Sequence, residues 1–306
     1  MAERERIVML SGGAGSWGAA RRIADRYGTE QLTLLFADTL IEDDDLYRFL
    51  LEATANLLGA SVPADLLRAT ASIPPLGDEE GRRRHLLELA AAARSWCPSL
   101  EWIAEGRDPH QVFRDKRFLG NTRVDPCSAV LKRRLMRRWL EEHRDPAGSV
   151  AAIGYDWSEI HRFERAAGHW APWPVEAPLC ERPYLSKEEV FGWMEVEGLR
   201  PPRLYAEGFR HNNCGGFCVK GGQASFALLL RRYPERYRYH ERREQELREA
   251  LGKDVAILRD RTGGETKPLS LRRFRRRLEC DPAAFDRGQW GACSCMESTA
   301  TARGGA

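Results

Sequence analysis

The first half of the chain alternates short apolar runs with helical patterns. The run at 7–10 is apolar throughout, which is typical of a buried strand. It ends in the glycine-rich stretch SGGAGS at 11–16, and the next helix is predicted to begin near Ser16 as its N-cap. A second buried-strand pattern covers 32–39, and a helix is predicted over 43–58. A strand, a glycine-rich turn, a helix and a strand in this order predict a parallel α/β sheet.

The rest of the chain is predicted to be mostly helical, with one further strand. Residues 60–120 have a mixed helical and irregular pattern, which we interpret as an insertion over one edge of the sheet. A basic amphipathic helix is predicted over 128–143 and a strand over 149–156. A Ser-x-x-Glu capping box predicts a helix over 186–198. From Cys214 onward, helices are expected around cysteine-bearing turns.

These patterns predict an α/β fold with a parallel twisted sheet and helices on both faces. We expect an α/β domain over residues 1–200 that carries the insertion, and a mostly helical C-terminal lobe over 201–306. The lobe holds five of the eight cysteines, so it is the expected place for any cysteine chemistry.

Length and charge narrow the class of protein. A chain of 306 residues with a net charge of +3 can bury a full core and is not a polycation. No apolar run approaches a membrane span, and the start MAERERIV lacks a signal-peptide core, so we expect a cytoplasmic protein with no membrane contact.

Arginines concentrate at 131–139, 229–243 and 271–279. These runs are either solvated helix faces or surfaces that follow a nucleic-acid backbone.

Three loops are predicted to meet at one edge of the sheet, because ligands bind beyond the carboxyl ends of parallel strands. The first, at 11–16, has glycines that permit close approach of a phosphate beside a helix N-terminus; the alternative is a tight turn that binds nothing. The second, at 38–39, could meet a ribose or a base, and Arg162 is a candidate phosphate clamp beyond the third, at 154–158. The candidate ligand-binding residues are Ser11, Gly12, Gly13, Gly15, Ser16, Asp38, Thr39, Gly154, Ser158 and Arg162.

Eight cysteines without an export signal indicate metal or redox chemistry rather than a disulfide framework. Cys97 and Cys280 lie in helical patterns and are interpreted as small hydrophobic residues, while Cys180 is ambiguous. The others lie in turn-like sequence with glycine or proline: Cys127, Cys214, Cys218, Cys293 and Cys295.

Four stretches, in sequence order, resemble one family. SGGAGS is similar to a PP-loop, and LLFADTLIEDDDLYRF is similar to the strand that ends in Asp-Thr before acidic residues and an aromatic helix. GYDWSEIHR resembles a motif that contacts nucleotide phosphates, and the segment 178–218 resembles a capped helix followed by a glycine-aromatic step into a cysteine pair. Together they resemble the PP-loop superfamily of adenine-nucleotide α-hydrolases, in its phosphoadenosine phosphosulfate (PAPS) reductase-like branch.

The resemblance implies a PP-loop, HUP-like fold in which residues 1–200 bind ATP or a related adenine nucleotide. Ala14 stands where many ATP-using members have lysine, which leaves cleavage of ATP and binding of a sulfonucleotide both open. The Glu-Cys-Gly-Leu-His-type motif of PAPS reductases does not occur in the chain.

The resemblance also implies a metal centre. Members with an iron–sulfur cluster take ligands from a cysteine ahead of the basic helix, where Cys127 stands, and from a later cysteine pair, where Cys214 and Cys218 stand with three residues between them instead of two. With Cys293 and Cys295 there are five candidates for the four ligand places of a 4Fe–4S cluster or, alternatively, a zinc ion.

These features predict an ATP-dependent sulfurtransferase. It would adenylate an RNA base or the DNA backbone and insert sulfur with the help of the cluster, supplied by a donor protein such as a cysteine desulfurase. One alternative is a sulfonucleotide reductase that acts on PAPS or its 3′-dephosphorylated analogue. Another is a zinc-stabilised, nucleotide-binding interaction module without turnover.

Overall fold

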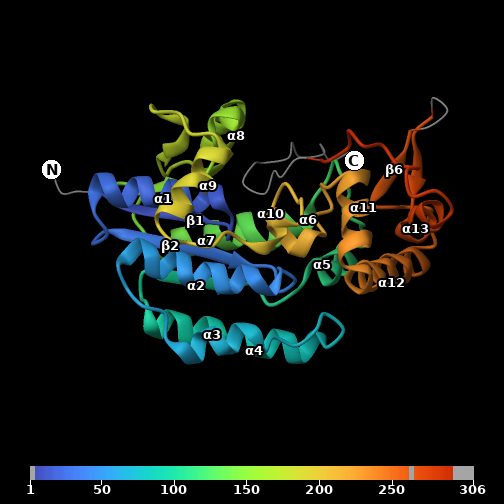
Figure 1. Cartoon of the computed structure of the whole chain (residues 1–306), viewed down its shortest axis with the longest axis horizontal. Helices are drawn as coiled ribbons and strands as arrows, with labels where there is room; N and C mark the ends of the chain where they lie inside the picture. The colour runs from blue at the N-terminus through green and yellow to red at the C-terminus, as the bar shows by residue number, and fades with distance from the viewer. Residues whose placement is uncertain (1–3, 262–264, 292–306) are drawn as a thin grey trace.

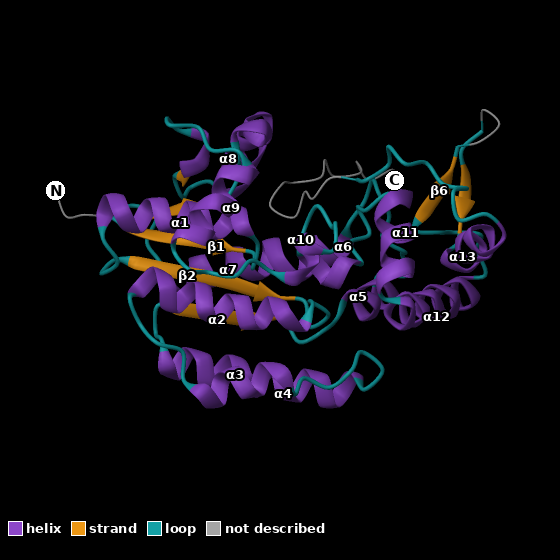
Figure 2. Cartoon of the chain, viewed as in Figure 1, coloured by secondary structure: helices purple, strands orange, loops and turns teal. Residues whose placement is uncertain are grey.

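The computed structural model describes residues 4–261 and 265–291, and its centre is a five-stranded parallel sheet (Figure 1, Figure 2). The strand order is β3-β2-β1-β4-β5, and every pair in it is parallel. The strands are β1 (Glu5–Leu10), β2 (Leu32–Asp38), β3 (Leu100–Ala104), β4 (Ser149–Ala152) and β5 (Val175–Glu176). The predicted α/β class, with a parallel sheet and flanking helices, is therefore confirmed.

Helices make up most of the remaining described residues. They are α1 (Ala14–Tyr27), α2 (Asp44–Leu58), α3 (Ala64–Ala71), α4 (Glu79–Trp96), α5 (Pro109–Asp115), α6 (Pro126–Ser128), α7 (Leu135–His143), α8 (Phe163–Trp170), α9 (Lys187–Val196), α10 (Arg203–Ala206), α11 (Gln223–Arg232), α12 (Pro234–Leu251) and α13 (Leu271–Cys280). Shorter helical segments are the π-helical η1 (Ala129–Arg134) and the 3₁₀ turns η2 (Trp157–Arg162), η3 (Pro178–Cys180) and η4 (Asn213–Gly216). None of these helices is long and apolar enough to cross a membrane.

The sheet has a hydrophobic cluster on each face. Successive side chains of a strand point to opposite faces, so β1 sends Val8 and Leu10 to one side and Ile7 and Met9 to the other. Helices α1, α2, α4 and α9 cover the face of Val8, and α7 and α8 cover the face of Ile7. This arrangement is the two-sided layering that the near-continuous apolar character of β1 and β2 predicts.

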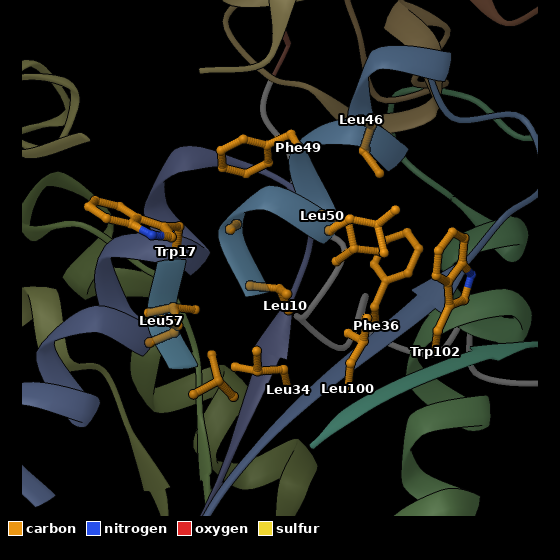
Figure 3. Close-up of a cluster of buried hydrophobic side chains, with 14 of the residues drawn as sticks. Leu10, Trp17, Leu34, Phe36, Leu46, Phe49, Leu50, Leu57, Leu100 and Trp102 are labelled. Atoms are coloured by element: carbon orange, nitrogen blue, oxygen red, sulfur yellow. The ribbon is translucent and has the colours of Figure 1, made fainter. Parts of the chain in front are cut away.

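A cluster of buried hydrophobic side chains fills the core between the sheet and α2 (Figure 3). Leu10 and Phe36 of the sheet pack in the same cluster as Leu46, Phe49 and Leu50 of α2, and all five are at most 1% exposed. Burial of each such side chain contributes about 1.5–3 kcal/mol. This packing fixes the end of β2 and the start of α2 beside the loop that follows β1.

The interpretation of 60–120 as an insertion only is wrong, because the segment contains β3. This strand pairs in parallel with β2, from Leu100 opposite Leu34 to Ala104 opposite Asp38, and forms an edge of the sheet. Its five residues include the polar Glu101, so its apolar pattern is too short to be recognised as a strand.

The helix after β1 begins three residues earlier than predicted. Gly13 is the N-cap of α1, and Ser16 lies inside the first turn. The Ser16 hydroxyl donates to the Gly13 carbonyl oxygen at 2.9 Å, a bond back into the loop. Serine therefore stabilises the loop here without being the N-cap.

The basic helix expected over 128–143 is present as the continuous segment α6, η1 and α7. Two of its basic residues face inward: Lys132 and Arg133 are each 3% exposed. They pair with buried carboxylates, Lys132 with Glu42 at 3.1 Å and Arg133 with Asp125 at 3.5 Å. The Lys132 pair thus joins the helix to the loop after β2, whereas the Arg133 pair lies within the helical segment, because Asp125 is the N-cap of α6.

The C-terminal segment shares its core with earlier parts of the chain. Helices α11 to α13 and the hairpin of β6 (Leu258–Asp260) and β7 (Lys267–Leu269) form one hydrophobic cluster with α5 and η1. Helices α11 to α13 and β6 lie at one end of the molecule, and α1 lies toward the other end (Figure 1). Cys97 is buried as expected, but Cys280, the last residue of α13, is exposed and is not a core residue.

Candidate functional site

A cleft opens where the strand order reverses. From β1 the chain builds β2 and β3 on one side and β4 and β5 on the other, so β1 and β4 flank the topological switch point. Ligands in open α/β sheets bind at this position. A cavity of about 690 Å³ lies here. Of the predicted residues, it is lined by Ser11, Gly13, Gly15, Ser16, Gly154, Ser158 and Arg162.

The loop 11–16 is held in shape by its own polar groups. The backbone N–H of Ser11 donates to the Ser16 hydroxyl oxygen at 3.1 Å, and the two hydroxyls are also 3.1 Å apart. Gly12 has φ +71°, which favours glycine, and its carbonyl accepts from the side-chain amide of Asn212 at 2.8 Å. The loop that the sequence singled out is therefore a preformed turn tied to a segment 200 residues away.

Close backbone packing explains why positions 15 and 154 are glycine. A Cβ atom on Gly15 would lie 2.7 Å from the carbonyl oxygen of Gly154, and one on Gly154 would lie 2.5 Å from the Cα of Ser16. The loops after β1 and β4 thus touch, which brings 11–16 and 154–158 to one wall as predicted. Gly13 has a different neighbour, because its Cβ would lie 2.9 Å from the Tyr205 hydroxyl.

Cationic side chains converge on the same cleft. Lys187, Arg210 and Arg162 line it together with His211. Burial, followed by the positive charges of these three residues, lowers the pKa of His211 from 6.5 to about 4. A neutral imidazole held among three cations indicates a locally positive potential, which suits a polyanionic ligand.

Arg162 is positioned by its own neighbours. It is 7% exposed, donates to the carboxylate of Glu159 three residues earlier in η2, and lies 4.7 Å from the centre of the Tyr155 ring. A guanidinium held this way presents a planar set of donors to the cleft. The geometry is compatible with the predicted clamp.

Sequence reasoning missed the residues that complete the cleft. They are Lys187 at the start of α9, Tyr205 in α10, and the pair Arg210 and His211. The backbone N–H of Ala14 donates to the Tyr205 hydroxyl at 3.4 Å, so this tyrosine lies directly on the loop. All four residues lie in the segment 178–218, but no local pattern separates them from surface residues.

Asp38 and Thr39 are not among the residues that line the cleft. Asp38 is 1% exposed and accepts hydrogen bonds from the Leu40 N–H, the Tyr47 hydroxyl and the Trp102 indole N–H. Burial raises its pKa to about 6. Its hydrogen bonds to the protein interior give it a structural role at the end of β2. Gly12 likewise does not line the cleft.

Three predicted metal ligands line one small, largely apolar cavity. These are Cys127, Cys214 and Cys218, and Thr39 and Lys132 line it too. Lys132 also lines the main cleft, so the two cavities adjoin. Within 4–261 and 265–291, no three histidine, cysteine or carboxylate side chains are arranged to hold a metal ion. The other predicted ligands, Cys293 and Cys295, lie outside the described residues.

The turn that carries Cys214 is anchored by two carboxylates. The buried Glu42 accepts from the Cys214 N–H and from the Thr39 hydroxyl. Asp43 accepts from Arg236 at 2.8 Å, and the same guanidinium donates to the Gly215 carbonyl at 2.8 Å. Cys214 itself has φ +52° in this turn. The acidic stretch after β2 therefore connects the end of the sheet to the cysteine turn.

Many arginines of the basic runs are paired within the molecule. Arg236 binds Asp43, Arg275 binds Glu241, and Arg277 binds Asp260. These pairs stabilise the packing of α12 and α13, so the charge runs are in large part structural.

Comparison with models of known protein families gives no match, and comparison with curated proteins gives none either. The functional interpretation therefore rests on the motifs of the chain and on the geometry of its cleft.

Proposed function

We propose that the chain is a PP-loop, HUP-like enzyme that binds ATP in this cleft and adenylates an acceptor as the first half of sulfur transfer. One observation carries the proposal: the preformed loop 11–16 lies at the topological switch point and shares its cavity with Arg162, Lys187 and Arg210. Amides at a helix N-terminus together with converging cations suit the triphosphate of a nucleotide.

In the proposed reaction an acceptor oxygen attacks the α-phosphorus of ATP. The new O–P bond forms as the bond to the β-bridging oxygen breaks, and pyrophosphate leaves with the electron pair. Arg162 and Lys187 would stabilise the developing negative charge. A sulfur nucleophile from a donor protein such as a cysteine desulfurase then displaces AMP.

The proposed soft metal centre is supported by three predicted ligands that line one cavity beside the main cleft, and it needs a further ligand from outside the described residues. Cys127, Cys214 and Cys218 would be ligands of a 4Fe–4S cluster or a zinc ion, with a fourth ligand from Cys293 or Cys295. A bound cluster would supply iron that can hold or relay sulfur, whereas zinc would supply a structural cross-link.

Pyrophosphate release tests the proposed activity. Full-length protein is incubated with ATP and with candidate acceptors, RNA or DNA, and pyrophosphate is measured. We expect acceptor-dependent release from the parent and none from Arg162→Ala. Release of sulfite from PAPS, without pyrophosphate from ATP, would instead establish the sulfonucleotide reductase. Nucleotide binding without either product would establish the interaction module.

Metal content tests the proposed cofactor. The anaerobically purified protein is analysed for iron, zinc and acid-labile sulfide, and Cys214→Ser is compared with Cys97→Ser. The two thiols are matched in burial, at 9% and 8% exposure. We expect Cys214→Ser to lose metal and Cys97→Ser to retain it. Equal metal content in both variants, or none in the parent, would contradict the metal centre.

A further inference from the structure

Two aromatic side chains stack on each other in solvent at the edge of the cleft. The rings of Trp157 and Tyr184 have centroids 4.0 Å apart and planes inclined by 24°. Trp157 is 44% exposed and Tyr184 is 40% exposed, and Ile160, which lies in η2 with Trp157, is 41% exposed. In the described ranges, seven large hydrophobic residues are this exposed; two of them form this stacked pair, and a third lies in the same short helix as Trp157. Such a concentration indicates a binding surface.

The pair joins two walls of the cleft. Trp157 begins η2, whose next residues, Ser158 and Glu159, line the cavity. Tyr184 precedes α9, which contributes Lys187 to the same cavity. The aromatic surface is therefore continuous with the proposed nucleotide site and is not a separate patch.

The charge around the pair is predominantly positive. The exposed guanidinium of Arg182 lies 5.8 Å from the centre of the Tyr184 ring, and Arg162, Lys187 and Arg210 line the adjoining cleft. Three acids also line the cleft: Glu159 is paired with Arg162, Asp156 caps η2 by accepting from the Ser158 N–H, and Glu188 lies beside Lys187 in the chain. A ligand that fits this surface has a flat apolar part for the rings and negative charge for the cations.

We propose that Trp157 and Tyr184 form a stacking platform for an unpaired base of a single-stranded nucleic acid, whose backbone phosphates follow Arg182 into the cleft. The inference rests on the proposed function and names the class of its acceptor. Bases stack on exposed aromatic rings in a sequence-tolerant way, and each such contact strengthens binding about 5- to 150-fold. A protein partner would need a larger apolar surface than these three side chains provide.

Oligonucleotide binding to the full chain tests the platform. The probes are fluorescein-labelled single strands of about 20 nucleotides of mixed sequence, one DNA and one RNA, and anisotropy gives the affinity. We expect the parent to bind at least one of them and Trp157→Ala to bind it at least about tenfold more weakly. Trp157→Phe keeps a stacking ring and should stay within about threefold of the parent.

Phe118→Ala is the matched control, because Phe118 is also 40% exposed and does not line the cleft. It should bind the probes as the parent does. Equal affinity of Trp157→Ala and the parent, or a parent that binds neither single strand, would overturn the platform. Titration of ATP into the same proteins separates the two proposals. Normal ATP binding without oligonucleotide binding refutes the platform alone, and Trp157-dependent oligonucleotide binding without ATP binding refutes the proposed function alone.

Discussion

Replacement of Glu42 by glutamine tests how the cleft and the cysteine turn are held together. The fully buried carboxylate accepts from Lys132 Nζ at 3.1 Å, from the Thr39 hydroxyl at 3.0 Å and from the Cys214 N–H. Glutamine has nearly the same shape and keeps one oxygen as an acceptor, so Glu42→Gln removes mainly the negative charge. Lys132 would then be a buried cation that has lost this carboxylate partner.

The expected cost follows from the geometry of the pair. At 3.1 Å and an effective dielectric constant near 20, the Coulomb attraction is about 5 kcal/mol before desolvation is considered. Removing one partner of a buried pair costs about 3–5 kcal/mol in measured cases. We therefore expect Glu42→Gln to lower the free energy of unfolding by about 3 kcal/mol. Lys132→Met in the same background should recover at least about 1 kcal/mol of that loss.

Urea unfolding measures both effects, provided that the slope of the transition is unchanged. Glu141→Gln is the control, because Glu141 pairs with Arg137 on the surface at 52% exposure and should cost less than about 1 kcal/mol. A Glu42→Gln variant as stable as the control would refute the reasoning. So would strictly additive effects of Glu42→Gln and Lys132→Met, because these would show that the two charges do not interact.

Three further substitutions probe the cleft. Gly154→Ala should weaken ATP binding, measured by calorimetry, at least tenfold, because the new Cβ would lie 2.5 Å from Ser16 Cα. Gly168→Ala is the control and should bind ATP as the parent does, because a Cβ at that position of α8 meets open space. Arg162→Lys should weaken ATP binding severalfold in the same assay, because lysine keeps the charge without the planar donors. The phosphates of bound ATP should raise the pKa of His211 from about 4, so ATP affinity should rise as the pH falls from 7 to 5. Binding should then be accompanied by proton uptake, and His211→Asn should abolish that uptake.

Each of these expectations has a contrary result. Equal losses of affinity in the two glycine variants would mean that the close contact between the loops does not matter. An Arg162→Lys protein that binds ATP as tightly as the parent would make Arg162 a structural residue only. A flat pH profile, or proton uptake that persists in His211→Asn, would separate that histidine from the bound phosphates.

The sheet and its first loop were predictable because their signals are local. The apolar run of β1, the glycines that follow and the apolar run of β2 each lie within a few residues. The edge strand β3 was missed because an edge strand of five residues buries only part of its side chains, here Leu100 and Trp102 completely. Its identity as a strand depends on pairing with β2, which a local pattern does not report.

The role of Asp38 could not be predicted for a related reason. An aspartate at the carboxyl end of a parallel strand, followed by threonine, has the local sequence pattern of a ligand-binding residue. Its oxygens are instead bonded by Tyr47, nine residues away, and by Trp102, 64 residues away. Arg162 was predicted, but Lys187 and Arg210 were missed because they come from segments that meet the loop 11–16 only in the folded chain. Long-range contacts decide both cases.

Calorimetric titration of magnesium-ATP into the full-length protein and into Gly13→Val tests the central claim most directly. The claim is that the loop 11–16 binds the phosphates of an adenine nucleotide. We expect the parent to bind ATP, and Gly13→Val to bind at least about tenfold more weakly while it stays folded, because a branched side chain would stand on the loop within 2.9 Å of the Tyr205 hydroxyl. A parent that does not bind ATP, or a folded Gly13→Val that binds it as tightly as the parent, would contradict the account.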